Sequence, residues 1–133
     1  MLDCFKNKKI LVTGHTGFKG AWLSQWLLSL GAELAGFSLY MPSKPALFDV
    51  LSLSEKMTDF RGDIRDLDAL MGVCRDFKPE VVFHLAAQPI VLAAYKDPKT
   101  TFDTNFGGSV NVMEVVRHIG GVKVLVMITS DKC

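Results

Sequence analysis

Apolar residues along the chain form two alternating kinds of segment, short continuous runs and longer stretches with helical spacing. Continuous runs are typical of strands buried on both faces of a parallel sheet, and they cover residues 8–13, 33–39, 57–61, 81–85 and 122–128. Amphipathic stretches between them predict helices over residues 17–30 and 67–77, and a later helix that ends at Gly120 and Gly121. The alternation predicts an α/β fold in which helices cover both faces of a parallel sheet.

The order of these segments predicts a doubly wound, Rossmann-like sheet. Right-handed crossovers give the strand order 3-2-1-4-5, with a ligand crevice at the carboxyl ends of the first and fourth strands. The sequence stops five residues after the fifth predicted strand, so we expect a sheet truncated at that point. Residues 1–133 are interpreted as one dinucleotide-binding domain, an N-terminal fragment of a longer protein whose substrate domain is absent.

Two helical faces carry the large apolar side chains. The first predicted helix repeats them at Phe18, Trp22, Leu23, Trp26, Leu27 and Leu30, so we expect both tryptophans in the core. The later helix repeats them at Phe102, Phe106, Val110, Met113 and Val116. Gly107 and Gly108 lie inside that helix, where they allow a neighbouring backbone to approach closely.

Three evenly spaced glycines separate the first predicted strand from the first predicted helix. Residues 12–20 read Val-Thr-Gly-His-Thr-Gly-Phe-Lys-Gly, with the glycines at 14, 17 and 20. Glycine there permits a tight turn, the approach of a pyrophosphate to the backbone and close packing of helix on strand. Glycine-rich turns also serve only to reverse a chain. The position between strand and helix favours a dinucleotide whose phosphates bind the helix N-terminus.

The composition argues against several classes of function. The chain is 49% apolar and 22% charged with a net charge of +1, which gives no basic footprint for nucleic acid or a membrane surface. Its apolar runs are far shorter than the roughly 20 residues that span a bilayer, and no signal peptide is recognised, so we expect a cytoplasmic location. Cys4, Cys74 and Cys133 lack metal-ligand spacing and are interpreted as mostly structural thiols and not as a disulfide framework; no metal site is predicted.

Residues after the second and third strands are candidates for the adenosine end of a dinucleotide. An acidic residue normally binds the ribose after the second strand, but only Ser38 is available there, so NAD and NADP are not distinguished. Lys44 is a possible phosphate partner or simply a solvated lysine. Asp63 is placed to accept a hydrogen bond from the adenine amino group with Ile64 against the ring, or to begin the turn into the next helix.

Residues after the fourth and fifth strands are candidates for the reactive end. Leu85, Ala86 and Ala87 let a cofactor lie against the backbone or reflect tight packing, and Gln88 points nearer the crevice. His84 is interpreted as a core histidine bonded to the backbone. The run after the fifth strand offers a hydroxyl, an acid and an amine, which suit proton transfer, although it is also typical of a capped turn: Thr129, Ser130, Asp131 and Lys132.

Five segments together resemble the extended short-chain dehydrogenase/reductases. Residues 13–20, 62–66, 84–89, 104–105 and 128–133 read TGHTGFKG, GDIRD, HLAAQP, TN and ITSDKC. The glycine spacing and Leu-Ala-Ala are shared by many sugar-nucleotide epimerases and dehydratases. HTGFKG and TSDKC are narrower signals, and they make the chain most similar to the nucleotide-sugar 4,6-dehydratases that act on CDP-glucose. The resemblance corresponds to the N-terminal, cofactor-binding part of such enzymes.

The resemblance implies a function and a set of site residues. It implies a bound NAD, a nucleotide-sugar substrate, conversion of CDP-glucose to CDP-4-keto-6-deoxyglucose, and a homodimer in the full-length form. Cofactor-binding positions would be Gly14, Thr16, Gly17, Phe18, Lys19, Gly20, Ser38, Asp63, Ile64, Leu85, Ala86, Ala87, Gln88, Thr104 and Thr129. Ser130 would bond the sugar C4 oxygen, Asp131 would protonate the C6 hydroxyl, and Lys132 would occupy the place of the C5 base.

One element of the family is not found where it belongs. The family's Tyr-x-x-x-Lys pair lies on a helix after the fifth strand, and the pairs Tyr40/Lys44 and Tyr95/Lys99 have the spacing but precede that strand. This departure predicts that the chain alone is inactive. An epimerase or reductase of the same fold, and a dinucleotide-binding module without chemistry, are alternatives. Absence of the later strands also predicts self-association through exposed apolar surface.

Overall fold

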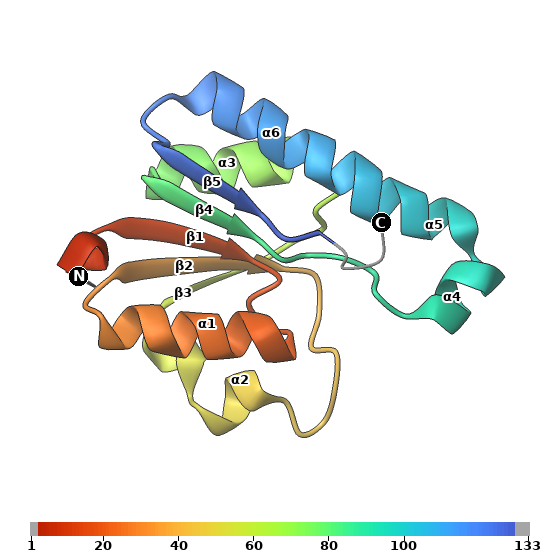
Figure 1. The fold of residues 1–133 in the computed structure, drawn as a ribbon, viewed down its shortest axis with the longest axis horizontal. Helices are drawn as coiled ribbons and strands as arrows, with labels where there is room; N and C mark the ends of the chain where they lie inside the picture. The colour runs from red at the N-terminus through yellow and green to blue at the C-terminus, as the bar shows by residue number, and fades with distance from the viewer. Residues whose placement is uncertain (1–2, 130–133) are drawn as a thin grey trace.

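A five-stranded parallel sheet organises the chain (Figure 1). The structure is a computed structural model that describes residues 3–129. The strands lie in the order β3-β2-β1-β4-β5, which confirms the predicted α/β fold and strand order. Their bounds are β1 (Lys9–Thr13), β2 (Glu33–Ser38), β3 (Thr58–Arg61), β4 (Val81–His84) and β5 (Val124–Met127).

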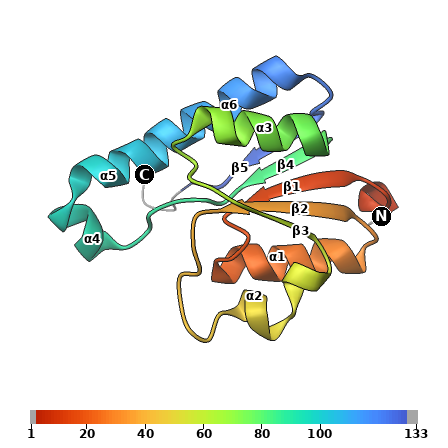
Figure 2. The ribbon, with the colours of Figure 1, turned by 180° about the vertical axis from the view of Figure 1, so that it is seen from behind.

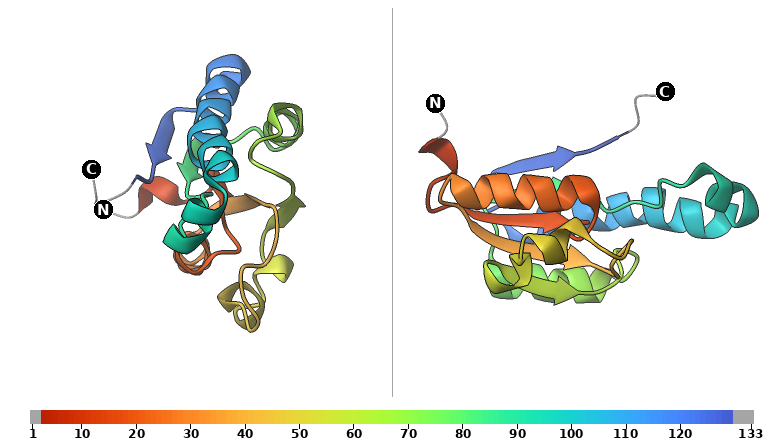
Figure 3. Two further views of the ribbon diagram at one scale, coloured as in Figure 1. Left: turned by 90° about the vertical axis from the view of Figure 1, so that its right-hand side faces the viewer. Right: turned by 90° about the horizontal axis from the view of Figure 1, so that it is seen from below.

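Helices cover both faces of this sheet, as Figures 1 and 2 show. One face carries α1 (Phe18–Ser29) and α2 (Leu47–Val50), and the other carries α3 (Leu67–Phe77) and α6 (Gly108–Ile119). Three short elements precede α6 in the chain and extend away from the sheet, beyond the carboxyl ends of the strands (Figure 3). They are α4 (Val91–Lys96), α5 (Pro98–Phe102) and the π-helical turn η3 (Asp103–Gly107). The 3-10 turns are η1 (Asp3–Phe5) and η2 (Leu53–Glu55).

Two apolar clusters, one on each face, explain the continuous apolar runs. Leu11 of β1 packs with α3 and α6, whereas its neighbours Ile10 and Val12 pack with α1 and α2. Successive side chains of a strand point to opposite faces, so a strand covered on both sides is apolar at every position. All three side chains are fully buried.

Local signals set the limits of the elements. Asp66 caps α3 by accepting a hydrogen bond from the Ala69 backbone N–H at 3.0 Å, and Lys78 ends the helix in a left-handed conformation. The proline-containing segment after β2 is a loop, as predicted. Two short elements after it, α2 and η2, were not predicted, because a single turn of helix gives too few residues to show a period.

The prediction that both tryptophans lie in the core is wrong. Trp22 and Trp26 are 53% and 50% exposed. The buried face of α1 instead carries three small residues, Gly20, Ala21 and Ser24, together with Leu27. Small residues let α1 approach the glycine turn and the sheet closely, which turns the bulky aromatic rings outward.

The apolar face predicted for the later helix is also mostly exposed. Phe102 and Phe106 are each 71% exposed, and Val110 and Met113 are about half exposed. The face packed on the sheet carries Gly108, Val112 and Val115. This segment has two apolar stripes, one buried and one exposed. Helical spacing detects an apolar stripe but does not say which stripe meets the core. The α-helical period of the segment is further interrupted by the π-helical turn.

We expect the exposed stripe of α5, η3 and α6 to drive self-association of the 133-residue chain. Static light scattering at increasing protein concentration should report a dimer or larger species. Serine at both Phe102 and Phe106 should shift the chain toward monomer, because it removes the two most exposed rings of the stripe. Val50→Ser, at an equally exposed site on α2, is the matched control. A wild-type chain that stays monomeric at high concentration would contradict this expectation.

Candidate dinucleotide site

The turn between β1 and α1 has a backbone path that only glycine can follow. Gly14 has a φ of +76°, and a Cβ there would lie 2.7 Å from the Ala86 nitrogen in the loop after β4. At Gly20 a Cβ would lie 2.1 Å from the Gly14 carbonyl oxygen. The turn therefore packs backbone against backbone on two sides, as the glycine spacing predicts.

The start of α1 suits an anionic ligand. Gly17, the N-cap, offers no side-chain cap, and the first turn carries no acidic residue. Backbone N–H groups at such a terminus and the helix dipole favour phosphate. Phe18 and Lys19 are exposed beside this terminus. The glycine path and the uncapped helix start together fit the pyrophosphate of a dinucleotide.

His15, inside the glycine turn, is a buried residue that sequence reasoning did not single out. Its Nε2 lies 2.8 Å from Asp59 Oδ1, and its Nδ1 lies 3.0 Å from Ser38 Oγ. Burial lowers the pKa of His15, although the neighbouring Asp59 acts in the opposite direction. A Cβ on Gly36 would lie 2.2 Å from the ring, so β2 makes room for the imidazole. The ring thereby joins the glycine turn to β2 and β3.

The hydroxyl of Ser38 takes part in the hydrogen bonds of His15. Ser38 is 5% exposed, and its hydroxyl is engaged with the imidazole inside the protein. Thr16 contributes on the same side, because its hydroxyl donates to the Tyr40 carbonyl at 2.8 Å and fixes the loop after β2 against the start of α1. A bond from Ser38 to a ribose stays a prediction.

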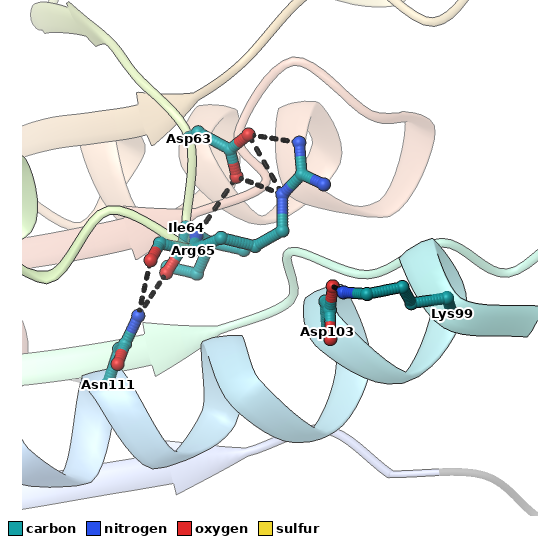
Figure 4. A network of polar contacts seen from close by, with 6 residues as sticks. All are labelled: Asp63, Ile64, Arg65, Lys99, Asp103 and Asn111. Carbon is teal, nitrogen blue, oxygen red and sulfur yellow. Dashed lines mark hydrogen bonds and ion pairs between the residues drawn. The ribbon is translucent and has the colours of Figure 1, made fainter.

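The loop after β3 presents Asp63 beside a guanidinium (Figure 4). Both Asp63 oxygens lie 3.0 Å from Arg65 Nε, and this hydrogen bonding lowers the pKa of Asp63. Ile64 packs inward, where a Cβ on Gly108 would lie 2.7 Å from its Cγ2. Asn111 of α6 donates to the carbonyls of Ile64 and Arg65, both at 3.0 Å. The loop is rigidly held with Asp63 partly exposed, and adenine binding by Asp63 and Ile64 stays a prediction.

The loop after β4 is held by side chains from other elements. Gln88 and Asn105 form a reciprocal pair, in which Asn105 Oδ1 accepts from the Gln88 backbone N–H at 2.7 Å and Asn105 Nδ2 donates to the Gln88 carbonyl at 3.1 Å. Leu85, Ala86 and Ala87 therefore run between the glycine turn and η3, where Thr104 also lies. The backbone of Leu85 and Ala86 makes the contact with Gly14.

His84 is buried at the end of β4, but its partners differ from the prediction. Its ring nitrogens contact the hydroxyls of Thr13 and Ser109 rather than backbone groups, at 2.7 Å and 3.3 Å. Burial lowers the pKa of His84 to about 4, so the ring is neutral at neutral pH. The sequence pattern did not connect Thr13 or Ser109 with His84.

The chain after β5 runs next to this loop. The Ile128 backbone N–H donates to the His84 carbonyl at 3.1 Å, and Thr129 is exposed directly beyond it. Ser130, Asp131 and Lys132 lie outside the described residues. Their catalytic roles stay predictions.

The two tyrosine–lysine pairs have the positions expected from sequence. Tyr95 lies on α4 and is 83% exposed, while Lys99 begins the next short helix and pairs with Asp103 (Figure 4). Asp97 lies between the two short helices and Pro98 begins the second, so Tyr95 and Lys99 do not share one continuous helix. Tyr40 and Lys44 lie in the loop after β2.

Three further observations concern the thiol of Cys74, metal binding and membrane-spanning helices. Cys74 is a buried free thiol whose pKa burial raises to about 12, as its interpretation as a structural thiol requires. Within residues 3–129, no group of three or more His, Cys, Asp or Glu side chains is arranged to hold a metal ion. None of the helices in the described part is long and apolar enough to cross a membrane.

The sheet, the glycine turn and the helix start define a dinucleotide-binding fold of the Rossmann type. The sequence pattern of the NAD dependent epimerase/dehydratase family matches residues 10–133. The chain belongs to that family.

Individual relatives agree with this assignment. A CDP-glucose 4,6-dehydratase from Salmonella typhimurium is 47% identical over 129 residues, which cover 97% of this chain and 36% of that protein. A UDP-glucose 4-epimerase from Mycolicibacterium smegmatis is 36% identical over 117 residues, covering 88% of this chain and 37% of the epimerase. The predicted resemblance to dehydratases of CDP-glucose is confirmed.

Solved structures show the same fold. UDP-glucose 4-epimerase from Thermus thermophilus, in complex with NAD, has a TM-score of 0.77 at 32% identity over 87% of this chain and 36% of its own. The epimerase Mth375 from Methanothermobacter thermautotrophicus has a TM-score of 0.81 at 27% identity, covering 98% of this chain and 37% of its own. The chain thus spans little more than a third of the length of these relatives.

Proposed function

We propose that this chain is the NAD-binding part of a nucleotide-sugar 4,6-dehydratase that converts CDP-glucose to CDP-4-keto-6-deoxyglucose. The observation that carries the proposal is the 47% identity to a CDP-glucose 4,6-dehydratase over 97% of the chain. The glycine turn and the uncapped start of α1 support the cofactor assignment, because they fit a pyrophosphate.

In this proposal the residues of the chain bind and orient the cofactor. Gly14, Gly17 and Gly20 admit the pyrophosphate to the backbone, and the N–H groups at the start of α1 bind its oxygens. Asp63, partly exposed after β3, accepts from the adenine amino group. Ala86, packed against Gly14, forms the wall on the other side. A bound NAD would supply a reversible hydride acceptor for the sugar.

The chemical groups at the sugar follow β5. In the proposal, Ser130 bonds the C4 oxygen, Asp131 protonates the C6 hydroxyl as it leaves, and Lys132 removes the C5 proton. A lysine acts as a base only when burial or a neighbouring cation lowers its pKa. The base for the C4 hydroxyl lies on the longer parent chain, so the 133-residue chain alone is inactive. In the parent we propose a homodimer.

The substrate assignment is tested by incubating the full-length parent protein with CDP-glucose and catalytic NAD. We expect CDP-4-keto-6-deoxyglucose to accumulate, detected by its alkaline absorbance and by NMR, with no net formation of NADH because the hydride returns to the sugar. UDP-glucose is the matched substrate control. Turnover of UDP-glucose to its C4 epimer without turnover of CDP-glucose would instead support an epimerase.

The cofactor assignment is tested separately on the 133-residue chain by calorimetric titration with NAD and with NADP. We expect NAD to bind, because the glycine turn and the start of α1 are formed in this part of the protein. Binding of NADP alone would reverse the assignment of the cofactor. Binding of neither, when the parent binds NAD, would show that the later part of the parent completes the crevice.

A further inference from the structure

A line of hydrogen bonds, buried at Thr13 and His84, joins the ends of β1 and β4 to the start of α6. It contains Thr13, which directly precedes the glycine turn, then His84 at the end of β4, and Ser109 in the first turn of α6. Thr13 and His84 are opposite each other in the parallel pairing of β1 with β4. Both residues are 3% exposed or less.

The donors and acceptors along this line allow one consistent direction. Thr13 Oγ1 accepts the Ala86 backbone N–H at 3.2 Å, so its own proton is available to His84 Nδ1 at 2.7 Å. At the other end, the Ser109 hydroxyl donates to the Asn105 carbonyl at 2.6 Å and accepts from His84 Nε2 at 3.3 Å. A neutral imidazole has one donor and one acceptor nitrogen, so Nε2 carries the proton.

The reversed direction satisfies fewer groups. If Nδ1 carried the proton, the oxygen of Thr13 would accept from both Ala86 and His84, and its own proton would have no acceptor among these groups. Ser109 would then donate to His84 Nε2 and leave the Asn105 carbonyl without that bond. Because Thr13 is fully buried, its unpaired hydroxyl proton would be costly, so the first direction is the stable one.

Both ends of the line reach backbone that faces the cofactor site. The Ala86 nitrogen lies where a Cβ on Gly14 would be only 2.7 Å away, so the loop after β4 and the glycine turn are in direct contact. Asn105 belongs to η3 and clamps the backbone of Gln88. π-Helical turns are rare, and they are frequently found at functional sites.

We propose that His84 is a positioning residue, not a proton donor or acceptor in the reaction: its neutral ring, protonated at Nε2, fixes η3 and the loop 85–88 against the glycine turn. The inference rests on the proposed function, because a fixed gap between these loops serves a bound dinucleotide. The ring acts through Thr13 and Ser109 and touches no reacting atom.

The test uses Thr13→Val and Ser109→Ala in the full-length parent, with the affinity for NAD measured by calorimetry. Each variant removes one hydroxyl that makes two hydrogen bonds in the line. We expect roughly tenfold weaker NAD binding from each variant, because a net loss of about 1.4 kcal/mol corresponds to a factor of ten in affinity. Thr13→Ser keeps the hydroxyl and should restore the affinity. Ser24→Ala is the matched control, because Ser24 Oγ is buried with no hydrogen-bond partner in the described part of the chain.

The tautomer gives a readout independent of NAD. Imidazole nitrogen NMR of the parent should show His84 with Nε2 protonated and Nδ1 bare, and Thr13→Val should mix the two tautomers. A ring protonated at Nδ1, or unchanged NAD affinity in both Thr13→Val and Ser109→Ala, would overturn the proposal. If the wild-type parent fails to bind NAD, the proposed function falls, and the tautomer and its response to Thr13→Val still decide the role of His84.

Discussion

Replacing Gly20 by alanine should unfold or severely destabilise the glycine turn, with a loss of about 3 kcal/mol in the free energy of unfolding. The new Cβ would lie 2.1 Å from the Gly14 carbonyl oxygen and 2.8 Å from His15 Cα. Both neighbours are backbone, so no side-chain rotation relieves the clash. Alanine is favoured over glycine in a helix by up to about 1 kcal/mol, which is smaller than the steric cost.

Gly72→Ala is the matched control for this substitution. Gly72 lies within α3, and no described atom outside its own helix turn lies within 4 Å of the position that a Cβ would take. Here helix propensity acts alone, so we expect a gain of about 0.5–1 kcal/mol. Urea unfolding of the two variants and the wild type measures both effects. Equal stability of Gly20→Ala and the wild type would show that the backbone contact in the turn is looser than the structure describes.

NAD affinity separates the local from the global effect of Gly20→Ala. If α1 moves outward to relieve the clash, the first turn of the helix moves with it, and the phosphate-binding N–H groups lose their positions. We therefore expect NAD binding to be lost even under conditions in which the variant stays folded. Retained wild-type affinity would place the phosphates elsewhere in the crevice.

Acidification should remove about 3 kcal/mol of stability through His84 alone. Burial lowers the pKa of His84 from its ordinary 6.5 to about 4, so the unfolded chain binds the proton more tightly than the folded protein does. This stability is fully present above pH 6.5 and is lost progressively as the pH falls toward 4. Each unit of pKa difference corresponds to about 1.4 kcal/mol, which gives the stated magnitude.

His15 adds to the loss in the same direction. Burial lowers the pKa of His15, with Asp59 opposing and Arg61 reinforcing the change. Carboxylates respond at lower pH, because bonds from Lys123 and Lys8 hold the pKa of Glu80 at about 2 and its stabilising effect persists until the pH falls below the ordinary value of 4.5. The interval between pH 7 and pH 5 therefore reports chiefly on the two buried histidines.

Urea unfolding at several pH values in that interval measures the effect. His84→Gln should flatten the dependence, since it removes the titrating group that contributes the stated loss. His118→Gln, at an exposed position near the end of α6, is the control. A wild-type stability that is constant from pH 7 to pH 5 would show that the buried rings are already protonated or are solvated in the folded state.

The glycine turn and the sheet order were predictable because they are encoded locally. A run that is apolar at every position, such as residues 10–12 in β1, indicates burial on both faces without reference to its neighbours. The spacing of Gly14, Gly17 and Gly20 similarly specifies a backbone path within one short segment. Crossover handedness then limits the order in which such strands can be arranged.

The placement of the aromatic stripes was not predictable in this way. Trp22 and Phe102 belong to apolar helical faces, yet both are exposed. Smaller residues of α1 meet the sheet in place of Trp22, and α5, which carries Phe102, extends away from the sheet (Figure 3). A periodic pattern says that a face is apolar. It does not say whether the sheet, another part of the protein or another subunit covers it.

The polar interior likewise required the tertiary structure. His15 meets Asp59 from 44 residues away, and Thr13 meets His84 from 71 residues away. No local period connects such positions, because a hydrogen bond across a sheet depends on strand register and not on sequence spacing. By itself the sequence determined a Rossmann-like fold with a glycine turn for a dinucleotide. The tertiary structure decided which buried side chains hold that turn in shape, since only the folded register brings their polar atoms within bonding distance.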